Sequence, residues 1–147
     1  YRDDLRFKTK NSRLCNVIGK RVPDLAGKTV KQLKQRIPAD FGEPEHYAFH
    51  TGGRAVLDTI QSELDLSGMQ MNASRCILRD YGNMSSPSIL FVLKHLWESG
   101  DLKINDRIFA FTFGAGFCAH GFSMIYQHGD MDGRFFNRQE FRKVAVD

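Results

Sequence analysis

Three short segments of the chain place a polar side chain among glycines, where a strand is expected to turn into a helix or another strand. A histidine imidazole exchanges a proton near neutral pH, and an asparagine amide donates hydrogen bonds without titrating. Turns at the strand ends of an open α/β sheet are also where such folds bind ligands. The three segments are His50-Thr51-Gly52-Gly53, Tyr81-Gly82-Asn83-Met84-Ser85-Ser86 and Phe113-Gly114-Ala115-Gly116-Phe117.

Taken singly, each segment also has an interpretation without chemistry. A lone histidine at a strand end is more often a packed polar residue, and Gly-Asn is a common turn pair. The run GAGFCAHG (114–121) has the wrong spacing for a dinucleotide-binding loop, and a strand rather than a helix follows it. The chain contains no P-loop, HExxH or GxSxG motif.

The elements that would position these segments alternate between strand and helix. The order β-α-β-α-β-α-β-β predicts an α/β fold, a layered α/β/α domain over residues 13–128 with a mixed sheet closed by a hairpin. Residues 1–12 are expected to form a loop or fragment end, and residues 129–147 a polar tail. Strands are expected at 13–19, 45–50, 107–113 and 117–128, with a weak one within 66–79, and helices at 22–36 (Pro23 in its first turn), 53–64 and 87–100.

Composition limits the classes of partner. A chain of 147 residues with a net charge of +4 is long enough for one domain with a core and only mildly basic. It has no Lys/Arg run of the length that a nucleic-acid arm needs. Its longest apolar stretch, 108–124, is interrupted by polar residues and glycines. We therefore expect neither a nucleic-acid nor a membrane partner. Tyr1 in place of Met is compatible with a start inside a longer polypeptide or after processing.

The cysteines predict neither a metal site nor a disulfide framework. Cys15, Cys76 and Cys118 are odd in number and form no CxxC pair, which favours a reduced, cytoplasmic setting. None is expected at a strand-to-helix elbow, where a helix N-terminus would lower the thiol pKa. They are interpreted as small buried apolar residues rather than nucleophiles.

In their order and spacing the three segments resemble the C-terminal half of thiolase-fold condensing enzymes. The resemblance is closest to chalcone-synthase-like type III polyketide synthases and the related type III 3-oxoacyl-[acyl-carrier-protein] synthases, and it runs from about Arg13 to Gln127. HTGGRAVLDTI resembles that family's His-Pro-Gly-Gly-x-Ala-Ile-Leu-Asp segment, and SRCILRDYGNMSSPSILFVL its Gly-Asn-Met-Ser-Ser segment. FTFGAGF resembles its closing glycine-rich loop, nearer to the ketoacyl synthase form.

The resemblance implies an acyltransferase that catalyses a decarboxylative Claisen condensation. An acyl group is held on a cysteine, and a malonyl thioester loses CO₂ and attacks it. His50 and Asn83 are implied as the catalytic residues, favouring the thiolate and donating to the enolate oxygen. The backbone N–H of Ala115 is implied as an oxyanion-hole donor, which the flanking glycines leave accessible.

The resemblance also bears on substrates. Gly53 and Ala55 match positions that line the pantetheine tunnel, where small residues leave room for the substrate arm. Asn16 lies near the place where plant-type members carry a gating Phe, so specificity does not carry over. No cofactor is implied, because the substrates are thioesters of coenzyme A or of an acyl carrier protein. The family's nucleophilic cysteine lies in an N-terminal half that has no counterpart in these residues.

Three explanations remain open for the missing cysteine. The chain is the C-terminal part of a cleaved or split synthase, the N-terminal half is disordered or omitted, or the chain is a noncatalytic partner subunit or scaffold of a heteromeric synthase. The presence of both His50 and Asn83 favours the first two. One half of such a fold should expose an apolar helix face. We therefore expect a partner of similar fold, in a homodimer or heterodimer, with an acyl carrier protein as a further possible partner.

Overall fold

The computed structural model describes residues 12–114 and 117–127, with side chains from Arg21 onward. The predicted loop over the first residues and the predicted polar tail lie outside the described residues. The elements are α1 (Ser12–Gln35), the short 3₁₀ helix η1 (Ala39–Phe41), β1 (His46–Phe49), α2 (Arg54–Leu64), α3 (Gly68–Tyr81), α4 (Ser88–Glu98), β2 (Arg107–Phe113) and β3 (Ala119–Ile125).

The three strands form one mixed sheet in the order β1-β2-β3. β1 and β2 are parallel, with His46 opposite Ile108 and Phe49 opposite Phe111. β2 and β3 are antiparallel and form the closing hairpin, with Arg107 opposite Ile125. The predicted mixed sheet, its hairpin and the helix after β1 are therefore confirmed.

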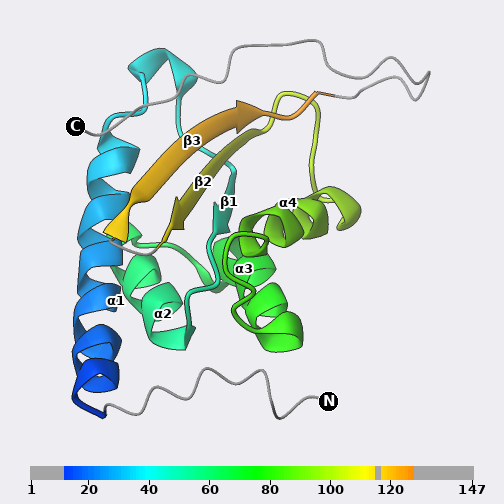
Figure 1. Cartoon of the computed structure of the whole chain (residues 1–147). Coiled ribbons are helices and arrows are strands. Elements are labelled where there is room, and N and C mark those ends of the chain that lie inside the picture. The colour runs from blue at the N-terminus through cyan, green and yellow to red at the C-terminus, as the bar shows by residue number, and fades with distance from the viewer. Residues whose placement is uncertain (1–11, 115–116, 128–147) are drawn as a thin grey trace.

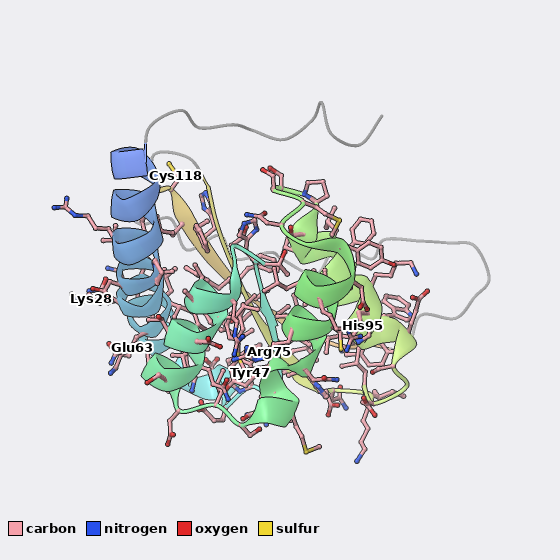
Figure 2. All side chains as sticks on the ribbon, turned by 90° about the horizontal axis from the view of Figure 1, so that it is seen from below. Lys28, Tyr47, Glu63, Arg75, His95 and Cys118 are labelled. Atoms are coloured by element: carbon pink, nitrogen blue, oxygen red, sulfur yellow. The ribbon has the colours of Figure 1, made fainter. Side chains whose placement is uncertain are left out.

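Helices cover both faces of the sheet (Figure 1). α1 and α2 pack on one face, against the aromatic side chains of the strands, and α3 and α4 pack on the other, against Ala48 and Ala110. Because successive strand residues point to opposite faces, the aromatic residues of β1 and β2 lie on one face of the sheet and the alanines on the other. Figure 2 shows the layers from below, with Lys28 on α1, Glu63 on α2 and Arg75 on α3. The aromatic residues that face α1 and α2 are Tyr47, Phe49, Phe109 and Phe111.

The strand predicted at residues 13–19 is wrong, because this segment forms the first two turns of α1. Its apolar residues Leu14, Val17 and Ile18 are spaced by three and one, which fits a helical face better than alternation. The same face continues through the buried Ala26, Val30 and Leu33. Pro23 accordingly lies inside the helix rather than in its first turn, where it leaves the carbonyl of Gly19 without its usual donor.

The weak strand predicted within residues 66–79 is also wrong, because these residues belong to α3 and its cap. Ser67 and Gln70 form a capping box that satisfies two free N–H groups at the start of the helix. Met71, Ser74 and Ile77 then recur at helical spacing and are buried. In the described residues the sheet has three strands rather than the expected five, and three consecutive helices connect β1 to β2.

Candidate active site

His50 follows the last residue of β1 and lies at the carboxyl end of the parallel strand pair. Its backbone N–H donates to the carbonyl of Phe111 at 2.9 Å, so the ladder with β2 extends one residue past the strand. The side chain is only 5% exposed. Its ring stands edge-on to that of Phe113, with centroids 4.8 Å apart. The hydrogen bond to β2 thus fixes the backbone of His50, and the contact with Phe113 fixes its ring.

The Nδ1 atom of His50 is buried and has no hydrogen-bond partner among the described residues. In that part of the chain it is the one buried side-chain polar atom in this condition. Burial lowers the pKa of the imidazole from its ordinary value of 6.5, which favours the neutral ring. A neutral imidazole carries one donor nitrogen and one acceptor nitrogen. The ring therefore offers a hydrogen-bonding atom that a group outside the described residues could use.

The turn after His50 is tight and depends on its glycines. The Gly52 N–H donates to the His50 carbonyl at 2.9 Å. A Cβ on Gly52 would lie 2.5 Å from Cζ of Phe113, a distance that real Cβ atoms do not adopt. Gly53 has a φ of +142° and precedes α2, and a Cβ there would meet nothing within 4 Å. Ala55 is exposed in the first turn of α2. The pantetheine-lining roles of Gly53 and Ala55 stay predictions.

Asn83 lies in the loop between α3 and α4, which starts where Gly82 ends α3 at a φ of +72°. Its side chain is exposed, and its Oδ1 atom accepts from the Ser85 N–H at 2.8 Å. This Asx turn engages the amide oxygen and leaves the amide nitrogen as the donor. The Thr51 hydroxyl donates to the Gly82 carbonyl at 3.1 Å. The structure therefore brings the His50 turn and the Asn83 loop into direct contact.

The third segment closes the β2–β3 hairpin. The Gly114 N–H donates to the Cys118 carbonyl at 2.9 Å, and Phe117 adopts a φ of +53°. The Phe117 ring stacks on Phe113 with centroids 5.7 Å apart. Because Phe113 also contacts His50, the end of the hairpin lies close to the His50 ring. Ala115 lies outside the described residues, so its role as an oxyanion-hole donor stays a prediction.

Two other predicted positions differ from expectation. Asn16 lies on α1 and not on a strand, and its side chain is outside the described residues. The interpretation of the cysteines as buried apolar residues is wrong for Cys118, which is exposed at the hairpin (Figure 2). Cys76 is half-buried in the middle of α3, with Sγ 3.5 Å from Oδ1 of Asn72. Neither thiol lies at the start of a helix, so neither has the setting that activates a nucleophile.

Sequence reasoning missed three buried hydroxyls around the site, those of Thr51, Ser74 and Ser88. The partners of Ser74 and Thr51 are backbone groups of distant segments, such as the carbonyl of Gly82, 31 residues after Thr51. The one available signal was a polar residue between His50 and Gly52, where the related motif has proline. In the part of the chain that the structure describes, no group of three metal-ligating residues gathers, and no helix is long and apolar enough to cross a membrane.

A mixed sheet between helical layers, with a histidine and an asparagine on adjoining turns, is the arrangement that the resemblance to thiolase-fold condensing enzymes predicts. The family model described as "Chalcone and stilbene synthases, C-terminal domain" matches residues 4–125. This chain therefore belongs to the family of chalcone and stilbene synthase C-terminal domains.

Two relatives from Arabidopsis thaliana are similar over part of this chain. The chain is 45% identical over 85 residues to 3-ketoacyl-CoA synthase 5 and 43% identical over 88 residues to 3-ketoacyl-CoA synthase 2. These matches cover 57% and 60% of this chain and 17% of each relative. The chain thus spans less than a fifth of the length of the curated relatives that it matches.

A solved structure is similar in fold. It is 1,3,6,8-tetrahydroxynaphthalene synthase from Streptomyces coelicolor A3(2), a bacterial type III polyketide synthase, with a TM-score of 0.66 and 27% sequence identity. The alignment covers 75% of this chain and 32% of that enzyme. Fold and sequence thus agree that the chain comes from a condensing-enzyme family.

Proposed function

We propose that the chain supplies His50 and Asn83 to a site that condenses a malonyl thioester with an acyl group by decarboxylative Claisen chemistry. The acyl group is held on a cysteine outside these 147 residues. We call this chain, together with the polypeptide segment that carries the cysteine, the native synthase.

The buried and unpartnered Nδ1 of His50 is the observation that carries this proposal. A buried polar atom without a partner costs about 1–3 kcal/mol, so a packed structural histidine would ordinarily be satisfied. The cost is accounted for if the ring serves a group that a further segment or a substrate brings. The Asn83 amide lies on the adjoining loop, held there by the contact between Thr51 and Gly82.

The proposed reaction has two bond-forming steps. The cysteine thiolate attacks the acyl thioester, and the first thiol leaves. The bond between the malonyl carboxylate and its methylene carbon then breaks, CO₂ departs, and the electron pair passes to the thioester oxygen as an enolate. The enolate carbon attacks the acyl carbonyl, and the cysteine thiolate is released. The product is a thioester extended by two carbons.

The side chains of this chain act on the enolate and not on the breaking bond. The amide nitrogen of Asn83 and a ring nitrogen of His50 donate to the enolate oxygen, and the Ala115 N–H donates to the oxyanion of the second step. Burial lowers the pKa of His50, which favours the neutral ring, and a neutral ring would stabilise the oxygen by donating a hydrogen bond from its N–H. Gly53 and Ala55 leave space for the pantetheine arm.

We propose coenzyme A thioesters as the substrates rather than carrier-protein thioesters. The names of the two plant relatives describe 3-ketoacyl-CoA synthases, which supports this choice. The mild positive charge of the chain suits either phosphate-bearing carrier and does not discriminate between them.

The cysteine-bearing segment is proposed to pack on the outer face of α3 and α4. This face carries large apolar side chains in contact with solvent, and a shallow hollow of about 340 Å³ lies among Leu93, Lys94, Trp97 and Glu98. Exposed apolar side chains on one helical layer mark an interaction surface. A segment of similar fold, in the same or a second polypeptide, is the occupant that the family supports. The exposed large apolar residues of α3 and α4 are Met69, Tyr81, Leu90, Phe91 and Trp97.

The alternative is a noncatalytic, thiolase-like partner subunit. The lack of an activated thiol among the described residues favours it, whereas the unpartnered His50 ring does not. Catalysis therefore has to be measured in the native synthase.

The experiment follows CO₂ release from malonyl-CoA labelled at its free carboxyl carbon. We expect His50→Gln and Asn83→Ala each to lower kcat about 100-fold or more, because each removes one donor to the developing oxyanion. The matched control is His46→Gln, a histidine at the start of β1 and at the end of the sheet remote from His50, which should keep the wild-type rate. Wild-type rates in both test variants would contradict the proposed catalytic roles and favour the interpretation of the chain as a noncatalytic partner subunit.

A further inference from the structure

The buried polar side chains of the described residues are gathered in one region. They are His50 and three hydroxyl residues, Thr51, Ser74 and Ser88, each of the latter with no measurable exposure. The hydroxyls of Thr51 and Ser74 bond to backbone groups of distant segments, and the Ser88 hydroxyl accepts from the Met84 N–H four residues before it. A buried hydroxyl destabilises the fold unless it is hydrogen-bonded, so three of them in one region indicate a specific role.

Ser74 ties the end of β1 to α3. β1 pairs with β2 along one edge, and the Phe49 N–H points away from that edge. This N–H donates to the Ser74 hydroxyl at 2.9 Å, in a buried setting. The residue before His50 is therefore held to α3, the helix that leads into the Asn83 loop.

Thr51 ties the residue after His50 to the start of the Asn83 loop. Its hydroxyl donates to the Gly82 carbonyl at 3.1 Å, and the Gly82 N–H donates to the Leu78 carbonyl at 3.0 Å. Gly82 is thus held from both sides, one residue before Asn83.

Ser88 ties the far end of the loop to α4. Its hydroxyl accepts from the Met84 N–H at 3.0 Å, and its own N–H donates to the Ser85 carbonyl at 3.0 Å. Met84 is the residue directly after Asn83. The loop is therefore fixed on both sides of Asn83 by buried hydroxyls.

We infer that Thr51, with Ser74 and Ser88, is a positioning residue that sets the Asn83 amide relative to the His50 ring. The inference rests on the proposed function. None of the three hydroxyls is assigned to substrate, and each acts through the backbone that carries a donor. Valine has nearly the same shape as threonine, so the shape of the site alone does not require the Thr51 hydroxyl.

The Thr51 link is a feature of this chain rather than of the family motif. The related His-Pro-Gly-Gly segment has proline at this position, which has no hydroxyl to donate. In this chain the distance between the two donors therefore depends on a hydrogen bond that the proline form cannot make.

The experiment measures CO₂ release from malonyl-CoA in the native synthase carrying Thr51→Val, Thr51→Ser or Ser88→Ala. We expect Thr51→Val to lower kcat about 10- to 100-fold with little change in KM, because a misplaced donor weakens the transition state more than the bound substrate. Thr51→Ser keeps the hydroxyl and should restore most of the rate. Thr59→Val is the matched control, since it removes a threonine hydroxyl that donates to a carbonyl within α2.

A second readout follows the loop itself by amide hydrogen exchange. Ser88→Ala removes the acceptor of the Met84 N–H, so the protection of that amide should fall by about tenfold while the β1 amides keep theirs. If Thr51→Val does not fold, the rate and exchange of Ser88→Ala decide the question.

The outcomes separate the two claims. Loss of activity in His50→Gln with wild-type kcat in Thr51→Val and Ser88→Ala would overturn the positioning role alone. Equal losses in Thr51→Val and Thr51→Ser would overturn it too, because the hydroxyl would then not matter. Wild-type activity in His50→Gln would overturn the proposed function, and the positioning role with it.

Discussion

The ring of Phe113 supports two features of the His50 turn at once. It stands edge-on to the imidazole, and it lies where a side chain on Gly52 would be. Gly52 is therefore required by contact with a neighbour, whereas Gly53 has open space and is required by its φ of +142°. The two glycines of this motif are therefore required for different physical reasons, one steric and one conformational.

We predict that Gly52→Ala destabilises the fold by about 1–3 kcal/mol, because the new methyl group overpacks the site and displaces the Phe113 ring. Urea unfolding measures the change. Gly68→Ala is the control: it begins α3, and a Cβ there meets nothing within 4 Å, so the variant should be neutral or more stable. Equal stability of Gly52→Ala and wild type would mean that the ring moves without cost.

At this scale the sequence predicts His50 and Asn83 as candidate site residues but not the contacts that hold them in place. Both residues stand in local motifs that can be read directly. The hydroxyl of Thr51 finds its partner in another segment, and the ring of Phe113 meets His50 only because β1 and β2 are parallel neighbours. Such contacts depend on the register of the sheet, which local spacing does not specify.

The strand β1 is anchored at its start by an ion pair with the start of β2. The Glu45 carboxylate accepts from the backbone N–H of Arg107 at 2.7 Å and from its Nε at 3.0 Å. Another nitrogen of the same guanidinium donates to the Phe41 carbonyl at 3.2 Å. These contacts with Arg107 lower the pKa of Glu45 to about 2. One arginine thus joins η1, β1 and β2 at the end of the sheet remote from His50.

We predict that the stabilisation by Glu45 is lost in acid. Because its folded-state pKa is depressed, the contribution is complete above the ordinary pKa of 4.5 and disappears as the pH falls toward about 2. Glu45→Gln should therefore be less stable than wild type at pH 7, and the difference should shrink across this range. Urea unfolding at several pH values measures it. A difference that is independent of pH would show that the carboxylate charge contributes nothing.

Element type was predictable where apolar spacing and turn residues agreed. β1, α2, α4 and the closing hairpin had clear boundaries at glycine or proline. The strand predicted at 13–19 and the weak strand predicted within 66–79 are helical instead, because the short apolar runs in both segments have a helical period. Leu14, Val17 and Ile18 have helical spacing, and the Ser67–Gln70 pair is a helix start that the sequence displayed.

At the scale of the whole molecule, most of the exposed large apolar side chains of the described residues belong to one of the two helical layers. α1 and α2 cover the aromatic face of the sheet, whereas α3 and α4 keep large apolar side chains in contact with solvent (Figure 1). The Asn83 loop connects these two exposed helices. A segment that covers this face would also reach the loop, and the proposed cysteine would then come close to His50.

The position of the acyl group tests the central proposal most directly. The native synthase is incubated with an acyl-CoA, digested, and analysed by mass spectrometry for the acylated peptide. We predict that the acyl group lies on a cysteine outside these 147 residues. Acylation of Cys15, Cys76 or Cys118, or of no cysteine at all, would contradict it.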